Sequence, residues 1–214
     1  PTHSIGPVCR LLDIHRTDRL HYLTAMQTNA FKGAEMYQEV MGKACDSFAN
    51  GDQTSTMIRT VRGKTILLQH NVMTPRPYSR MFQAVGTQGY VAKYPAPEVQ
   101  LSPMAAAKVG IEIEEGGTTL NTVQIERLLN HYAPSFSSET IALAKQLDSR
   151  GGMSFFMDLR LAQCLQDGLP LDMDVYDLAE WCSIAELSKL SVENGSIPVM
   201  IPDFVHRIHL YDKG

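Results

Sequence analysis

The sequence predicts an α+β domain with an open, mixed but largely antiparallel β-sheet and helices on one of its faces. Runs of β-forming residues separated by Gly-containing turns lie between residues 20 and 102, and helical periodicity of apolar residues follows between residues 122 and 193. Strands first and helices later are typical of an α+β domain. The composition, 44% hydrophobic and 20% charged over 214 residues, favours one globular domain with a core of ordinary size.

One helix and several strands are predicted for the first half of the chain. The helix covers residues 4–12, with Thr2 or Ser4 as its N-cap, and Pro7 is tolerable only in its first turn. Residues 31–42 are predicted as a loop or a short helix. The strands, which include two hairpins, are expected over residues 20–26, 54–61, 64–72, 81–85, 90–94 and 98–102.

Helices are predicted for the second half because apolar residues recur at helical spacing. The longest of them ends at Asn194 and Gly195. A sheet with helices on one face leaves its other face to water, another domain or another subunit, so we expect homo-oligomerisation through that face. The helices, several of them capped by Ser or Thr, are expected over residues 122–132, 137–147, 153–165 and 175–193.

Charge, hydropathy and cysteine spacing exclude several classes of protein. The net charge of −4 argues against nucleic-acid binding, because such proteins carry a basic surface. The longest apolar stretches, such as residues 65–68 and 197–201, are far too short for a membrane helix. The four cysteines are widely spaced without a Cys-x-x-Cys pair, so we interpret them as core or surface thiols and predict no metal site.

Generic catalytic motifs are missing from the chain. No Gly-x-Gly-x-x-Gly segment links a strand to a helix, so no dinucleotide-binding domain is predicted within these residues. The common serine-hydrolase, zincin and P-loop motifs are also missing. Because the chain opens at Pro1 without Met or a leader segment, we expect the natural protein to begin upstream of this residue.

Two polar segments are candidates for a ligand site. Pro1, Thr2, His3 and Ser4 stand at a predicted helix start, whose free N–H groups can hold a polar ligand, although a capped terminus is the simpler alternative. The second segment, residues 69–80, leaves a strand at a proline-stiffened turn. Prolines at positions 75 and 77 restrict the backbone around Arg76 and Tyr78 and suit them to contact a sugar hydroxyl. A solvated edge loop is the alternative.

Other polar clusters are interpreted as structural. The acids of residues 172–180 precede and open a helix, where they favour the helix dipole, and Asp172 and Asp174 are not assigned as a glycosidase acid pair. His15 and Arg16, with neighbouring acids, are predicted as exposed ion pairs; contact with a cofactor domain is the alternative. His206 and His209 do not form a metal site without further ligands.

Five segments together resemble glycoside hydrolase family 109, of the Gfo/Idh/MocA oxidoreductases, in order and approximate spacing: residues 1–3, 13–16, 69–71, 75–80 and 171–177. The resemblance implies an N-terminal Rossmann domain that binds NAD and lies outside this chain. Residues 1–214 would then be the substrate-binding and oligomerisation domain. Family members are bacterial and often exported, which favours an exported or periplasmic protein.

The family's reaction and site residues are further implications of the resemblance. Members cleave terminal α-linked N-acetylgalactosamine through oxidation at C3 by NAD+, elimination, water addition and return of the hydride by NADH. His3 and Tyr78 would act as the catalytic bases, and Pro1, Thr2 and Arg76 would contact the sugar. The family's tyrosine before Pro1 is not in this chain, and we expect the isolated chain to be inactive. Two alternatives stay open, a sugar or inositol dehydrogenase and a non-catalytic carbohydrate-binding or assembly module.

Overall fold

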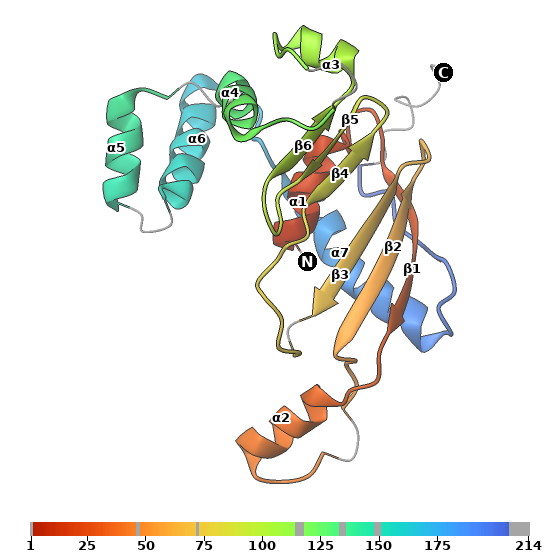
Figure 1. The fold of residues 1–214 in the computed structure, drawn as a ribbon. Helices are drawn as coiled ribbons and strands as arrows, with labels where there is room; N and C mark the ends of the chain where they lie inside the picture. Colours follow the sequence, from red (N-terminus) through yellow and green to blue (C-terminus); the bar gives the residue numbers. More distant parts are fainter. Residues whose placement is uncertain are drawn as a thin grey trace. The chain divides into compact units, whose positions relative to one another are not determined.

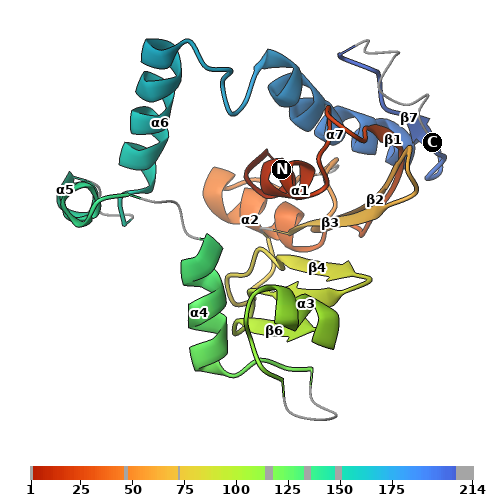
Figure 2. The same cartoon turned by 90° about the horizontal axis from the view of Figure 1, so that it is seen from above.

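The computed structural model describes residues 2–45, 48–71, 73–113, 118–132, 136–147 and 151–205. Helices and antiparallel strands make up the fold, which confirms the predicted α+β class (Figures 1 and 2). The chain divides into two compact units. One comprises Pro1–Pro77 with Met173–Gly214, and the other comprises Tyr78–Asp172.

The first unit is a four-stranded antiparallel sheet, in the order β3-β2-β1-β7, with two helices packed on one face. The backbone N–H of Ala25 donates to the Ser191 hydroxyl at 2.9 Å, which ties the central strand to the long helix. The elements of this unit are α1 (Thr2–Leu11), β1 (Leu20–Gln27), α2 (Lys32–Met41), β2 (Gln53–Thr60), β3 (Thr65–Asn71), α7 (Val175–Glu193) and β7 (Val199–Met200).

Strand register explains why one face of this sheet forms the core. Leu23, Ile58 and Ile66 are cross-strand neighbours, and all three are buried. Successive side chains of a strand point to opposite faces, so every second residue joins this face. Ile5 of α1 and Ile184 of α7 belong to the same buried cluster, which places both helices over the sheet.

Helix α1 packs closely on α7. A Cβ atom at Gly6 would lie 3.1 Å from the Trp181 ring, so glycine permits the close approach. The helix begins at Thr2, so the predicted N-caps Thr2 and Ser4 lie inside it, and Pro7 lies in its second turn rather than its first. Those two expectations were wrong. Because proline has no N–H, Pro7 leaves the His3 carbonyl without its intrahelical donor.

Helix α2 occupies the segment predicted as a loop or short helix. The Asp52 carboxylate accepts the backbone N–H groups of Phe31, Lys32 and Gly33 at 2.9–3.1 Å, which satisfies the start of the helix. These hydrogen bonds hold the pKa of the Asp52 carboxyl below its ordinary value. Gly42 ends the helix in the left-handed conformation, at φ 67°.

The second unit joins a three-stranded antiparallel sheet, in the order β4-β5-β6, to four helices. Its described core contains Val99, Ala106, Ile111 and Leu120. The elements of this unit are β4 (Gln83–Gly86), β5 (Gly89–Ala92), β6 (Glu98–Leu101), α3 (Pro103–Lys108), α4 (Thr122–Tyr132), α5 (Ser138–Leu147) and α6 (Met153–Asp167).

The division into two sheets differs from the single sheet that was expected. Pro75 and Pro77 lie a few residues beyond the end of β3 at Asn71. Because proline has no N–H to donate to a ladder, the first sheet does not continue through this segment. Two short elements, α3 and β7, were not predicted. The start of α3 nevertheless has a local signal, because the Ser102 hydroxyl accepts the Ala105 N–H at 3.2 Å and Pro103 takes the first helical position.

No helix within the described ranges is long and apolar enough to cross a membrane. Among the same residues, no group of three or more His, Cys, Asp or Glu side chains is arranged to hold a metal ion. The four cysteines are unpaired thiols; Cys9 and Cys164 are buried, and Cys182 is exposed.

Candidate functional site

The start of α1 presents His3 to solvent. His3 lies in the first turn of the helix with an exposed side chain, and Thr2 beside it is half-buried. The first N–H groups of a helix have no intrahelical acceptor, so this end can bind a polar ligand alongside the imidazole. Pro1, which the resemblance also implicates, lies outside the described residues.

The end of β3 is organised by Asn71. Its side-chain amide donates to Gln53 Oε1 at 3.1 Å, and its side-chain oxygen accepts both the backbone N–H and the hydroxyl of Thr74, at 3.3 and 2.9 Å. These contacts turn the chain toward the proline-rich segment. Arg76 lies exposed in that segment, within the first unit. His70, one residue before Asn71, lines a cavity beneath α7.

Tyr78 is the first residue of the second unit and is 73% exposed. Its phenol oxygen accepts a hydrogen bond from Arg80 Nε at 2.6 Å, and its ring lies edge-on to that of Tyr94 at 6.2 Å between centroids. The hydrogen bond from Arg80 and the ring contact with Tyr94 hold the orientation of the Tyr78 side chain. His3 and Arg76 belong to the first unit and Tyr78 to the second, so their convergence on one sugar stays a prediction.

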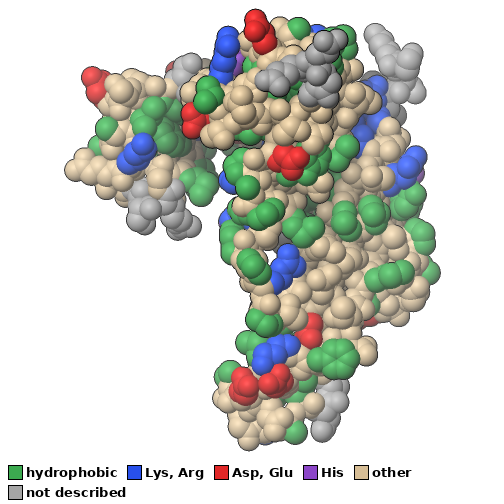
Figure 3. Space-filling view, in the orientation of Figure 1, with side chains coloured by type: hydrophobic (Ala, Val, Ile, Leu, Met, Phe, Trp, Pro, Cys, Tyr) green, Lys and Arg blue, Asp and Glu red, His purple; other side chains and the backbone are tan. Residues whose placement is uncertain are grey.

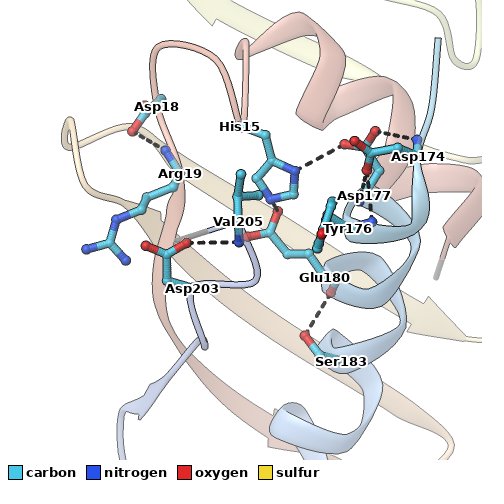
Figure 4. A network of polar contacts seen from close by, with 10 residues as sticks. All are labelled: His15, Asp18, Arg19, Asp174, Tyr176, Asp177, Glu180, Ser183, Asp203 and Val205. Atoms are coloured by element: carbon cyan, nitrogen blue, oxygen red, sulfur yellow. Dashed lines mark hydrogen bonds and ion pairs between the residues drawn. The ribbon is translucent and has the colours of Figure 1, made fainter. Parts of the chain in front are cut away.

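The most developed charge network in the first unit centres on His15 (Figure 4). His15 Nδ1 lies 3.3 Å from Asp177 Oδ1 and its Nε2 lies 3.0 Å from Glu180 Oε2. Glu180 is only 2% exposed, so the prediction that His15 forms exposed ion pairs was wrong. The loop after α1 folds back onto α7, and this buries the pair.

Burial and charge act in opposite directions on the pKa of His15. Burial lowers it, but the contact with Glu180 and the negative charges of Glu180 and Asp177 outweigh burial, so the pKa lies above its ordinary value. The folded chain therefore stabilises the imidazolium form more than the unfolded chain does. The ion pairs link the residues that follow α1 to α7, and α1 carries His3.

Asp18 makes a second buried connection from the same loop. Its Oδ1 accepts the backbone N–H groups of Arg19 and Arg62, at 2.9 and 3.0 Å, and its Oδ2 lies 3.2 Å from Lys64 Nζ. The side chain is fully buried. Asp18 therefore joins the loop after α1 to the turn between β2 and β3.

The comparison with protein families decides the identity of this domain. The model described as "Glycosyl hydrolase 109, C-terminal domain" matches residues 1–209. The chain belongs to glycosyl hydrolase family 109. The family predicted from five short segments is thereby confirmed.

Curated relatives of this family 109 chain include "Glycosyl hydrolase family 109 protein 1" of Bacteroides fragilis, 51% identical over 206 residues. "Glycosyl hydrolase family 109 protein" of Porphyromonas gingivalis is 50% identical over 209 residues. Each match covers 95% of this chain and 44% of the relative, so the chain spans somewhat less than half the length of these proteins. A crystal structure of an NAD-binding protein from Listeria innocua aligns with a TM-score of 0.48 and 13% identity, over 97% of this chain and 48% of its own.

The acids at the start of α7 have the structural role that was predicted for them in this family 109 chain. Asp174 caps the helix by accepting the N–H groups of Tyr176 and Asp177, at 2.8 and 3.0 Å, and Asp177 Oδ2 accepts the Asp174 N–H in return. Asp172 forms an exposed ion pair with Arg160 at 2.9 Å. What the sequence did not reveal is the burial of Glu180, one residue before the buried Trp181.

Cys9 does not supply a nucleophile to the family 109 domain. Burial, followed by the negative charge of Glu180, raises the pKa of the Cys9 thiol to about 12. A thiol with this pKa is almost fully protonated at neutral pH, and the thiolate is the reactive form. Among the predicted site residues, His3 and Tyr78 have accessible side chains that can exchange protons with a substrate.

A dinucleotide cradle does not occur among the described residues of the family 109 chain. Such a cradle needs a strand that leads through a Gly-rich turn into a helix. Two described strands lead into helices, β1 into α2 and β6 into α3, but the segments between them contain no glycine.

Proposed function

We propose that this chain is the substrate-binding part of an NAD-dependent glycosidase that releases terminal α-linked N-acetylgalactosamine. The observation that carries the proposal is the match of the family 109 C-terminal domain over residues 1–209. The exposed imidazole of His3 at the start of α1 supports it, because a catalytic base must be accessible to the sugar.

The described residues have distinct roles in this proposal. His3 accepts a proton from the sugar and returns it, and the helix start beside it binds a hydroxyl or amide oxygen. Tyr78 serves as the second base, and its hydrogen bond from Arg80 orients the phenol oxygen. Pro1, Thr2 and Arg76 complete the contacts to the sugar.

NAD, held mainly by the part of the protein outside this chain, supplies reversible removal of hydride from the sugar. The chain's own contribution is to bind the sugar and to move protons at its ring. Because the hydride returns, glycosidic cleavage proceeds without net consumption of NAD. This feature separates the proposal from a sugar dehydrogenase, which accumulates NADH.

The test uses the intact protein with an aryl α-N-acetylgalactosaminide, following the absorbance of the released phenol and of NADH together. We expect phenol release without accumulation of NADH. Accumulation of NADH without phenol release would identify a dehydrogenase, and sugar binding without either signal would identify a carbohydrate-binding module.

Replacing His3 with alanine tests the assigned base. General acid–base catalysis contributes roughly 100-fold or more, so we expect His3→Ala to lower kcat by at least about 100-fold while NAD stays bound. His131→Ala is the matched control, because His131 is also exposed but lies at the end of α4. Equal kcat values for the two variants would refute the role of His3.

We also propose that copies of the intact protein associate through the open face of the β1–β3 sheet. Hydrophobic side chains gather over these strands (Figure 3). Met26, Met57 and Leu67 are 68%, 44% and 56% exposed and alternate with residues of the opposite, buried face. We expect a Leu67→Lys variant to sediment as a smaller species than the parent protein.

An exported or periplasmic location of the protein is proposed on the family resemblance alone.

A further inference from the structure

A cavity of about 240 Å³ lies in the first unit, between the second half of α7 and the adjoining ends of β2 and β3. Thr2, His3, Arg76 and Tyr78 do not line it, whereas His70 of the candidate segment 69–80 does. Helix α1, which carries His3, packs against Trp181, whereas the cavity is lined from Ile184 to Glu193 further along α7. The cavity is therefore a separate feature from the start of α1.

The sheet face beneath α7 changes from apolar to polar in three successive rows. The row of Leu23, Ile58 and Ile66 is apolar and buried. Two residues along each strand, the row becomes Ala25, Thr56 and Leu68, and the last row consists of Gln27, Thr54 and His70. Apart from Ala25, the residues of the second and third rows form the floor of the cavity.

Helix α7 leaves this volume open because it presents small side chains over the polar rows. The exposed Ala185 and the buried Ser188 line the cavity with small side chains, and Ile184 and Val192 add apolar surface. An open volume beside polar groups is suited to a ligand or to water, whereas dry cavities in proteins have apolar walls.

The hydroxyl groups of the cavity retain unused hydrogen-bonding capacity. Ser188 donates to the Ile184 carbonyl at 2.6 Å, so the 2.9 Å contact between Thr56 and Ser188 must use the Thr56 proton. The lone pairs of Thr56 then remain available to a donor. The side chains of Thr54 and His70 make no hydrogen bond or ion pair with any residue that the structure describes.

The charges at the cavity are balanced. Lys189 Nζ and Glu193 Oε1, on successive turns of α7, lie 3.9 Å apart and contribute opposite charges. A wall of hydroxyls, an imidazole and balanced charges suits a neutral ligand that both donates and accepts hydrogen bonds. The volume equals that of about eight water molecules in the liquid, which is room for one sugar ring.

We propose that this cavity is a second binding site, for a neutral polyhydroxylated ligand of the size of one sugar ring. Its hydroxyls bind Thr54, Thr56 and His70, and its C–H groups pack on Leu68 and Val192. The site is independent of the chemistry proposed at His3, because binding here needs neither NAD nor turnover.

Methyl NMR of the intact protein, labelled at Ile, Leu and Val, tests the site with galactose and N-acetylgalactosamine as probes. We expect saturable shifts at the Ile184, Leu68 and Val192 methyls and none at Ile111 in the second unit. Thr54→Val should weaken this binding about 5–10-fold, because it removes one hydrogen bond and retains the side-chain shape.

The matched control is Thr65→Val, whose side chain lies on β3 but faces away from α7, and it should leave the affinity unchanged. His3→Ala should also retain these shifts, which separates failure of this proposal from failure of the proposed function. Absence of saturable shifts with both sugars would mean that the cavity holds water only. Equal effects of the two threonine variants, or tighter binding of galacturonate than of galactose, would likewise overturn the proposal.

Discussion

The two units of this chain differ in how they bury apolar side chains. The described core of the first unit contains eleven buried residues, contributed by α1, the sheet, α7 and the segments that follow α1 and β7, whereas the described core of the second contains four. Helices α5 and α6 each bury one described residue, while Leu147, Met153 and Leu165 on them are more than 60% exposed. We therefore expect the first unit to have the greater intrinsic stability. The exposed apolar side chains of α5 and α6 suit contact with another protein surface.

The ion pairs of the two units also differ in burial. His15 and Glu180 in the first unit are 13% and 2% exposed, and the pair joins two segments far apart in the sequence. Arg160 and Asp172 in the second unit are 43% and 46% exposed. Buried charges lose more hydration and respond more to loss of a partner, so the first pair has the larger influence on stability.

The largest expected change in the free energy of unfolding comes from truncating one buried isoleucine in each unit. Ile58→Ala in the first unit should lower the free energy of unfolding by about 3–4 kcal/mol, because Ile58 is fully buried in the larger core. Ile111→Ala in the second unit should lower the free energy of unfolding by about 2 kcal/mol, because the smaller core around Ile111 can collapse into the space that the truncation leaves. Chemical denaturation measures both values. A larger loss for Ile111→Ala would reverse the ranking of the units.

Removing the buried carboxylate should give the next largest effect. Glu180→Gln keeps the side-chain shape but removes the charge beside His15, and we expect a loss of about 2–3 kcal/mol in unfolding free energy. Glu186→Gln, at an exposed position of the same helix, is the control and should change little. If the two variants are equally stable, the His15–Glu180 contact contributes nothing to the stability of the fold.

The same pair predicts a pH dependence. The pKa of His15 is raised in the folded chain, so its contribution is fully present below the unfolded pKa and is lost as pH rises through the folded pKa. The unfolding free energy of the parent protein should therefore fall more than that of His15→Gln between about pH 6 and about pH 9. His131→Gln should retain the parent's slope. A steeper slope in His15→Gln would contradict the sign of this effect.

The exposed pair should give the smallest effect. Arg160→Gln removes its contact with Asp172 in the second unit, and the unfolding free energy should change little, since exposed ion pairs contribute little to stability. Thermal unfolding at low and high salt measures the difference. A loss as large as that of Glu180→Gln would show that exposure does not rank the two pairs.

Local sequence patterns predicted most elements of this fold because their causes are local. Residues 122–132 and 175–193 are helices with the predicted bounds, since apolar spacing and nearby caps mark both. The strand at 20–26 extends by one residue to Gln27. Alternation of side chains along a strand is a local property, so the sequence shows it even when the partner strands are unknown.

The candidate site was predicted in part. The segments that carry the family resemblance include His3 and Tyr78, and both side chains are exposed. His15 was predicted wrongly, because its surroundings depend on α7, which lies more than 150 residues further along the chain. The cavity beside Thr54 and His70 was not predicted, since it arises from strand register and from small residues on that same distant helix.

The sequence by itself determined the α+β class, most helices and strands, and the family, because periodicity, caps and short motifs depend on residues close together in the chain. Only the tertiary structure decided that the strands form two sheets, that Glu180 is buried against His15, and that a polar cavity lies beneath α7. The physical reason is that burial and electrostatic environment depend on which distant surfaces meet, and no local pattern encodes that meeting.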